Sequence, residues 1–465
     1  MHADFLAALV ARVGQSGVLT AEAAAPYCRD WRGRYSGVAL AVVLPADTAQ
    51  VAEVVKLCAA RGIAIVPQGG NTSLCGAGVP LETGDQIVLN LSRMKHIRSV
   101  DAANYTMTVE AGCTLSSIYT VAEEYNRLFP LGLTAIAPHC EIGGNLSTNA
   151  GGIGVLRYGN ARDLVLGLEV VLPDGQVWNG LRSLRKDNTG YDLKHLFIGA
   201  EGTLGIITAA VLKLFPRPHA TATACVAITH LQAAVRLLTH IRGHCGDTLS
   251  GFELISRSCL DLVFEHIPDT EEPFAQQYDY YVLIKLADVR AGELENGLRA
   301  ALQSFGAEIL AFDTTTGDAE HWWILRKNIA EAQKREGLSI KHDIAVPISR
   351  VAEFITRANA ALRAAYPTIR IIAFGHLGDG NIHYNVSLPD AAANSAFIQD
   401  EEPAVNTRVY AVVRDLNGSI SAEHGIGQLK RDTLCDHKDP LELELMRKIK
   451  ATLDPQGLMN PGKVV

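Results

Sequence analysis

The chain has 465 residues, a length that predicts two or three domains rather than a single core. Hydrophobic residues make up 48% and charged residues 20% of the chain, a balance that is typical of globular proteins and excludes a disordered chain. The net charge of −8 and the absence of any Lys/Arg run argue against a nucleic-acid-binding protein. A small carboxylate ligand is still compatible with this charge if a few cations are concentrated at one site.

The cysteines and the N-terminus indicate a cellular compartment. The nine cysteines are scattered and include no C-x-x-C pair, which predicts reduced thiols in a reducing environment. No apolar run approaches the roughly 20 residues of a membrane span. The stretch MHADFLAALVARVGQ lacks a basic start and is interrupted by Asp4, so we expect an amphipathic helix rather than a signal peptide. Together these features predict a cytoplasmic enzyme.

The first half of the chain mixes strands and helices. Asp47 is expected to cap a helix, with Gln50 as its capping-box partner, and Gly62 is expected to end that helix. A short buried strand follows at 63–66 and leads directly into a glycine-rich segment. Further strands are predicted at 86–92 and 106–112, and a hairpin over 164–178 that turns on Pro173, Asp174 and Gly175.

A domain boundary is expected at 215–224, FPRPHATATA, where two prolines are followed by small and polar residues. Beyond it the pattern predicts strands at 278–287, within 301–313, and at 339–346, 370–378 and 383–388, with helices at 321–335, 351–366 and 395–417. This alternation predicts an α+β sandwich with one sheet and helices on one face. Periodicity does not assign the last fifty residues to either part of the chain.

Three glycine-rich segments lie at predicted strand ends: PQGGNTSLCGAG (67–78), HCEIGGNLSTNAGGIG (139–154) and FIGAEGTLGIIT (197–208). Successive backbone amides in such turns form concave sites for phosphate oxygens, whereas any one segment alone would equally suit a tight surface loop. None of the three fits the G-x-G-x-x-G fingerprint, and no G-x-x-x-x-G-K-[ST] loop occurs. The three together predict an extended, phosphate-bearing cofactor, held in some way other than that of the dinucleotide fingerprint.

A second group of polar residues lies near the C-terminus. In GHLGDGNIHYNV (375–386) the Gly-Asp-Gly-Asn turn is expected to bring His376 and His383 together across a hairpin-like bend. His383 and Asn385 would then face the same side of the outgoing strand. The segment SAEHGIG adds Glu423 and His424, so that one could bind a metal ion while the other faces substrate. A lone histidine is more often a core or turn residue; the pattern as a whole favours a metal site.

The three glycine-rich segments resemble those that contact the flavin in the vanillyl-alcohol oxidase type of FAD-binding domain. The resemblance implies an α+β protein with an N-terminal helical segment (1–34), an FAD-binding domain (35–217), an antiparallel-sheet α+β substrate or cap domain (218–416) and a C-terminal helical segment returning to the flavin site (417–465). It also implies that FAD is contacted by Pro67, Gln68, Gly69, Gly70, Asn71, Thr72, Ser73, Gly76, Gly143, Gly144, Ser147, Thr148, Gly151, Gly152, Gly202, Ile207 and Asn460. Whether the flavin is covalently bound stays open; His139 and Cys140 lie close to the region.

The C-terminal segments closely resemble those of the FAD-linked D-2-hydroxyacid dehydrogenases, over about residues 35–465. The resemblance implies a divalent metal ion, zinc or manganese, bound by His376, His383 and Glu423. It implies that His424 is the catalytic base, and that substrate is bound by Arg326, Lys341, Asn385 and His424. One departure concerns the substrate, since Ala330 stands where members acting on 2-hydroxyglutarate usually carry a hydroxyl residue.

The expected reaction is the oxidation of a D-2-hydroxy acid, D-2-hydroxyglutarate first and D-lactate or a broader range as the alternative, with hydride transfer to FAD. The electron acceptor stays open between an electron-transfer flavoprotein, a quinone and a cytochrome, and the oligomeric state stays open between a monomer and a homodimer. An oxygen-using flavin oxidase is the rival within enzymes. A non-catalytic metal-binding sensor is the alternative of another class, although structural zinc sites usually contain cysteines, which are absent around these histidines.

Overall fold

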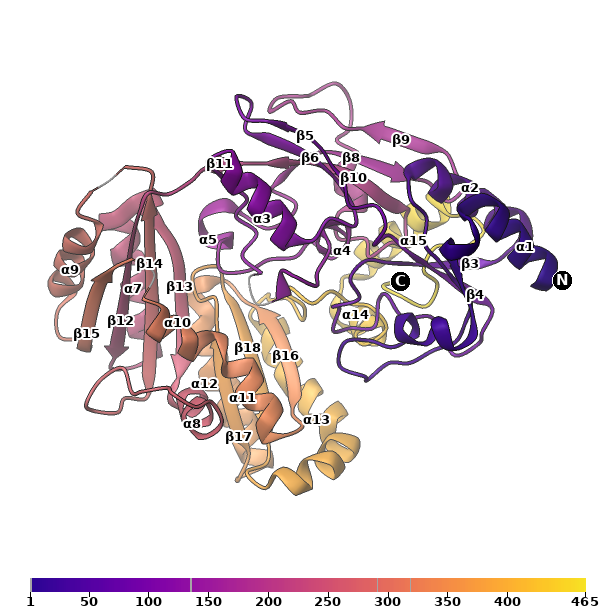
Figure 1. Cartoon of the computed structure of the whole chain (residues 1–465). Helices are drawn as coiled ribbons and strands as arrows, with labels where there is room; N and C mark the ends of the chain where they lie inside the picture. Colours follow the sequence, from indigo (N-terminus) through magenta and orange to yellow (C-terminus); the bar gives the residue numbers. More distant parts are fainter. Residues whose placement is uncertain (1, 134–135, 291, 318) are drawn as a thin grey trace. The chain divides into compact units, whose positions relative to one another are not determined.

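The computed structural model describes residues 2–133, 136–290, 292–317 and 319–465. The chain divides into two compact units. The first comprises residues 1–151, 159–217 and 423–465, and the second comprises 152–158 and 218–422 (Figure 1). The four-part division expected from the sequence stays a prediction, but the structure groups residues 423–465 with the glycine-rich N-terminal half.

The first unit contains two main sheets. The smaller has the strand order β1-β2-β4-β3, in which β2, β4 and β3 run parallel and β1 is antiparallel to β2. The larger is antiparallel with the order β5-β6-β10-β8-β9. The strands are β1 Val18–Leu19, β2 Ala39–Val43, β3 Ala64–Gln68, β4 Gln86–Asn90, β5 Ile97–Asp101, β6 Thr106–Glu110, β8 Val165–Val171, β9 Val177–Gly180 and β10 Ile206–Lys213, with a separate pair of β7 Arg127–Leu128 and β11 Phe215–Pro216.

Two helices of the first unit lie where the sequence predicts them. Helix α2 begins after Asp47, whose side chain accepts the N–H of Gln50, and it ends at Gly62 in the left-handed region at φ 64°. The helix predicted in the N-terminal stretch MHADFLAALVARVGQ is also present, as α1 His2–Val13. The α-helices of this unit are α1 His2–Val13, α2 Thr48–Arg61, α3 Leu115–Glu124, α4 Ile142–Ser147, α6 Lys194–Phe197, α14 Arg431–His437 and α15 Pro440–Leu453.

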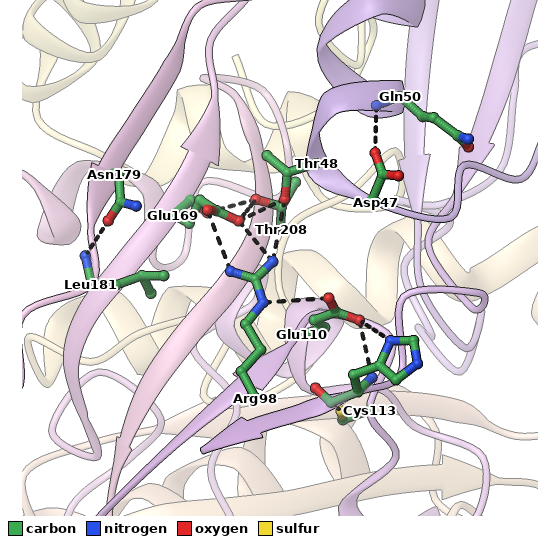
Figure 2. A network of polar contacts seen from close by, with 11 residues as sticks. Asp47, Thr48, Gln50, Arg98, Glu110, Cys113, Glu169, Asn179, Leu181 and Thr208 are labelled. Atoms are coloured by element: carbon green, nitrogen blue, oxygen red, sulfur yellow. Dashed lines mark hydrogen bonds and ion pairs between the residues drawn. The ribbon is translucent and has the colours of Figure 1, made fainter. Parts of the chain in front are cut away.

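A buried polar network ties the larger sheet to α2 (Figure 2). Arg98 on β5 binds Glu110 on β6 at 3.3 Å and Glu169 on β8 at 3.1 Å. Glu169 also accepts hydrogen bonds from Thr48 at 2.6 Å and from Thr208 at 2.9 Å. Burial alone would raise the pKa of Glu169, but the hydrogen bonds from Arg98, Thr48 and Thr208 outweigh it and lower the pKa. One cation on β5 thus pairs with two buried carboxylates, one on β6 and one on β8.

The second unit is built on one antiparallel sheet of seven strands in the order β15-β12-β14-β13-β17-β18-β16 (Figure 1). The strands are β12 Ala220–Ile228, β13 Leu249–Ser256, β14 Tyr280–Asp288, β15 Ile309–Thr316, β16 Ile340–Ala345, β17 Arg370–Gly375 and β18 Asn381–Ser387. The helices are α5 Val155–Tyr158, α7 Leu231–Cys245, α8 Arg257–His266, α9 Leu294–Phe305, α10 Glu320–Lys327, α11 Ile329–Glu336, α12 Val351–Ala365 and α13 Asn394–Asp415.

The prediction of helices on one face of this sheet is wrong. Helices α7, α9, α12 and α13 contribute to one core with the sheet, whereas α8, α10 and α11 contribute to a second core on its other face. Strand β13 is accordingly buried along its whole length, as expected for a strand covered on both sides.

The single helix predicted over 321–335 is two helices, α10 and α11, separated at Asn328. The side-chain amide of Asn328 donates to the carbonyl of Ile324 at 2.9 Å. The backbone N–H of Asn328 donates to the same carbonyl at 3.1 Å, and Asn328 ends α10 with backbone angles of φ −87° and ψ −1°. The interruption matters because Arg326 lies at the end of α10.

Candidate active site

A cleft in the first unit is lined by all three glycine-rich segments. Its lining includes Pro67, Gln68, Gly69, Gly70, Asn71, Thr72, Ser73, Gly143, Gly144, Ser147, Thr148, Gly151, Gly202 and Ile207 from the residues expected to contact FAD. The C-terminal tail contributes Glu423 and His424 to the same lining. Segments separated by more than 200 residues in the sequence therefore meet at one concave surface.

The first glycine-rich segment follows strand β3, and side-chain amides hold its backbone carbonyls in place. Gln68 donates to the carbonyl of Gly78 at 2.7 Å, and Asn90 donates to the carbonyl of Gly69 at 2.9 Å. A Cβ at Gly70 would lie 1.9 Å from the carbonyl oxygen of His139, so only glycine allows the first two segments to approach so closely.

The second segment forms the short helix α4. The N–H of Gly143 donates to the carbonyl of Ala111 at 2.8 Å, and a Cβ at Gly143 would lie 2.7 Å from the Cβ of Ala111. At Gly144 the situation differs, because a Cβ there would meet no described atom within 4 Å. Gly143 is therefore needed for packing, whereas Gly144 keeps space open beside the cleft.

The tail segment that carries Glu423 and His424 is held by Glu201, a residue that the sequence analysis did not single out. The Glu201 carboxylate accepts the backbone N–H of Ile426 at 2.7 Å and that of Gly427 at 2.8 Å. Burial raises the pKa of Glu201, while these two hydrogen bonds and Lys430 act in the opposite direction. Glu201 thus fixes the turn that follows His424.

Three buried polar atoms in the lining have no hydrogen-bond partner within the described ranges: Asn71 Oδ1, Glu141 Oε2 and Asn145 Oδ1. Buried polar atoms are normally paired, so these atoms indicate a ligand that hydrogen-bonds along the cleft. A ribityl chain has hydroxyl donors for the two amide oxygens, and the glycine-rich turns suit a pyrophosphate. The residues of the cleft therefore fit FAD.

Three of the residues expected to contact FAD are not in this lining. Gly76 packs against Tyr35, whose ring a Cβ at this position would meet at 2.9 Å. Gly152 groups with the second unit. Asn460 is buried, and its amide donates to the carbonyls of Ala77 and Glu201 at 3.1 Å and 2.7 Å. The contact of these three with the cofactor stays a prediction.

In the second unit, the strand register places a row of polar side chains on one sheet face. Residues directly opposite each other in an antiparallel pair share a face. Lys341 lies opposite Asn385, Asp343 opposite His383, and His383 opposite Phe374, whose ring belongs to the core of α8, α10 and α11. The polar row therefore lies on the face covered by these three helices, and Asn385 donates to Gln333 of α11 at 2.9 Å.

Glu253 on β13 contacts both Arg326, which is expected to bind a substrate carboxylate, and His376, which is an expected metal ligand. Its side chain is 1% exposed, and it accepts from Arg326 Nε at 2.7 Å and contacts His376 Nδ1 at 2.6 Å. Burial alone would raise the pKa of Glu253, but the charges of His376 and Arg326 outweigh it and hold the pKa at about 2. Sequence reasoning missed Glu253, although an acidic residue inside the apolar run GFELIS was a visible signal.

The two histidines of the GDGN turn converge as predicted. Strands β17 and β18 pair in antiparallel fashion, and the ring centroids of His376 and His383 lie 5.8 Å apart with nearly perpendicular planes. His383 Nδ1 also lies 3.7 Å from Asp343. Glu423 belongs to the first unit and the two histidines to the second, so their meeting at one ion stays a prediction.

Two family models match the chain. The FAD binding domain matches residues 39–180, and the C-terminal domain of FAD linked oxidases matches residues 217–464. The chain therefore belongs to the family of FAD linked oxidases. It is an FAD-dependent oxidoreductase that acts on CH–OH donors.

Curated relatives of this family are similar over nearly the whole chain. The mitochondrial D-2-hydroxyglutarate dehydrogenase of Rattus norvegicus is 37% identical over 94% of this chain and 80% of its own length. The D-2-hydroxyglutarate dehydrogenase of Xanthomonas citri is 36% identical over 94% of this chain and 92% of its own. A D-2-hydroxyglutarate–pyruvate transhydrogenase of Saccharomyces cerevisiae is 34% identical over 96% of this chain and 90% of its own. The chain belongs to the FAD-linked D-2-hydroxyacid dehydrogenases.

Solved structures show the same fold at low sequence identity. A substrate-bound p-cresol methylhydroxylase superposes with a TM-score of 0.78 at 16% identity, covering 99% of this chain and 96% of its own. A 4-ethylphenol oxidase from Gulosibacter chungangensis gives 0.76 at 15% identity over 99% and 96%. These likenesses establish the vanillyl-alcohol oxidase type of fold, as the glycine-rich segments predict.

None of the helices in the described ranges is long and apolar enough to cross a membrane. The cysteines form no disulfides there either. Because several relatives are named mitochondrial, the cytoplasmic location stays a prediction for this chain.

Proposed function

We propose that the protein oxidises D-2-hydroxyglutarate to the corresponding 2-oxo acid with FAD and a divalent metal ion, zinc or manganese. The observation that carries this proposal is the arrangement around Glu253, which holds Arg326 and His376 through one buried carboxylate. The D-2-hydroxyglutarate dehydrogenases named above support the same substrate.

The donor set fits a metal ion. Glu253 engages Nδ1 of His376, and Nε2 of the same ring would bind the metal in the carboxylate–histidine–metal arrangement common in metal sites. His383 would be the second ligand and Glu423 the third. Two imidazoles and one carboxylate leave an open position, which favours a catalytic site over the structural site of a sensor protein.

Residues of the chain would bind the substrate and remove the proton of its 2-hydroxyl group. The Arg326 guanidinium and the Lys341 ammonium would bind its carboxylates, and Asn385 would contact it from the neighbouring strand. His424, which lines the flavin cleft, would take the proton of the 2-hydroxyl group as general base. The metal would lower the pKa of that hydroxyl, and FAD would accept the Cα hydrogen as hydride.

The alternative substrate is D-lactate or a broader set of D-2-hydroxy acids. Ala330 is exposed on α11 and has no hydroxyl to offer a second carboxylate. The acceptor that reoxidises the flavin would be an electron-transfer flavoprotein, a quinone or a cytochrome; the name of the yeast relative adds a 2-oxo acid to these. Peroxide formation on substrate addition would identify an oxidase instead.

The base assignment is tested with a matched pair of histidine variants. The yellow protein is mixed anaerobically with (R)-2-hydroxyglutarate, and loss of the flavin absorption is followed. His424→Ala should keep the yellow colour and lose the bleaching by a factor of about 10²–10⁴. His195→Ala, which removes a partly exposed histidine outside the cleft, should bleach like the wild type. Normal bleaching of His424→Ala would remove His424 from the base role.

A further inference from the structure

Glu141 is a buried carboxyl group in the wall of the flavin cleft to which neither the sequence analysis nor the proposed reaction assigns a role. It precedes α4, and the residue is only 7% exposed. Its backbone forms an isolated bridge with Thr114. The side chain lies beside the first glycine-rich segment, because a Cβ at Gly69 would lie 3.3 Å from Glu141 Oε2.

The surroundings of Glu141 contain no compensating charge in the part of the chain that the structure describes. Its Oε2 has no hydrogen-bond partner there. The titratable groups that face it are the thiols of Cys113 and Cys140, whose pKa values burial raises to about 11. Burial likewise raises the pKa of Glu141 to about 8. The carboxyl is therefore largely protonated at neutral pH and is a hydrogen-bond donor.

Other buried carboxylates of the chain contrast with this arrangement. Glu253 lies beside Arg326 and His376, and Glu169 lies beside Arg98. A buried carboxyl without such a partner costs free energy unless a ligand uses it. Glu141 Oε2 lies beside Gly69 of the first glycine-rich segment, whose turn suits the oxygens of a phosphate.

We propose that Glu141 is a cofactor-binding residue that, as a neutral carboxylic acid, donates a hydrogen bond from Oε2 to a phosphate oxygen of bound FAD. Ionised Glu141 would instead place a negative charge beside the pyrophosphate. FAD affinity is therefore coupled to one proton. This inference requires the flavin alone and is independent of the metal ion and of the hydroxy acid.

The experiment measures the dissociation constant of FAD from the diluted holoenzyme by the recovery of flavin fluorescence, from about pH 6 to about pH 9.5. For the wild type the constant should be flat up to about pH 8 and then rise about tenfold per pH unit. Glu141→Gln keeps a donor and cannot ionise, so its constant should be flat throughout and lower than that of the wild type at the highest pH. Glu82→Gln, at an exposed position of the same unit, should follow the wild-type curve.

Glu141→Ala removes the donor and should weaken FAD binding by about tenfold at pH 6–7, with no pH dependence. A flat wild-type curve, or parallel curves for the wild type and Glu141→Gln, would overturn the inference. Infrared spectroscopy tests it without relying on flavin release. The wild-type holoenzyme at neutral pH should show the C=O stretch of a protonated carboxyl that is missing in Glu141→Gln, and absence of that band would also overturn it.

Discussion

Replacement of Arg98 by Met tests whether the polar network of Figure 2 stabilises the first unit. The side chains of Glu110 and Glu169 are 9% exposed, whereas that of Arg98 is 30% exposed. Removing one partner of a buried ion pair costs about 3–5 kcal/mol, and the partial exposure of Arg98 places the expected loss near the lower value, about 3 kcal/mol. The midpoint of thermal unfolding should fall by about 6–12 °C.

The loss of folding stability caused by Arg98→Met should depend on pH. A carboxylate whose pKa is lowered by folding contributes stability above its unfolded pKa, and this stability is lost as the pH falls through its folded pKa. The pKa of Glu169 is lowered in this way. The difference in stability between the wild type and Arg98→Met should therefore be largest near neutral pH and shrink below about pH 4.5, where the carboxylates become protonated.

The assay is thermal and urea unfolding followed by circular dichroism, with two further variants. Glu169→Gln added to Arg98→Met should recover part of the lost stability because it removes an unpaired buried charge. Arg236→Met breaks an exposed ion pair with Glu308 and should leave the unfolding midpoint almost unchanged. Equal effects of Arg98→Met and Arg236→Met, or a difference that stays constant from neutral to acid pH, would refute the reasoning.

Two further predictions concern the site itself. Glu253→Gln should weaken zinc binding and raise the KM for the hydroxy acid, each by about 10–100-fold, because Arg326 and His376 lose their shared carboxylate partner. A competition titration with a chelating dye measures the zinc affinity, and steady-state kinetics measure the KM. An unchanged zinc affinity would contradict the prediction. Gly144→Ala should fold normally, because a Cβ meets no described atom there, yet bind FAD more weakly. Gly70→Ala should instead impair folding, because its Cβ would clash with the carbonyl oxygen of His139. Unfolding and flavin titrations that give the same result for Gly144→Ala and Gly70→Ala would contradict the different roles of the two glycines.

The sequence predicts local structure well where one residue type has one clear role. The cap at Asp47 and the left-handed Gly62 define α2, and the GDGN turn brings two strands and two histidines together. The three glycine-rich segments predict the cleft because glycines of this density let backbone amides approach a phosphate-bearing ligand closely.

The sequence analysis fails where the outcome depends on tertiary packing. Helices cover both faces of the seven-stranded sheet, and the run of small and apolar residues in β12 was the available signal. The helix predicted over 321–335 is interrupted at Asn328, whose ψ of −1° departs from the α-helical value. Glu253 and Glu201 were missed because their partners are distant in sequence, at Arg326 and His376 and at Ile426 and Gly427.

The most direct test of the proposed reaction is anaerobic bleaching of the bound flavin by each enantiomer of 2-hydroxyglutarate, before and after chelation. We expect the (R)-enantiomer to bleach the metal-loaded protein and the (S)-enantiomer to leave it yellow. Chelation should abolish the bleaching without releasing the flavin, and added zinc or manganese should restore it. A yellow, metal-loaded protein whose absorption stays unchanged with (R)-2-hydroxyglutarate, or one that bleaches equally well after chelation, would contradict the account.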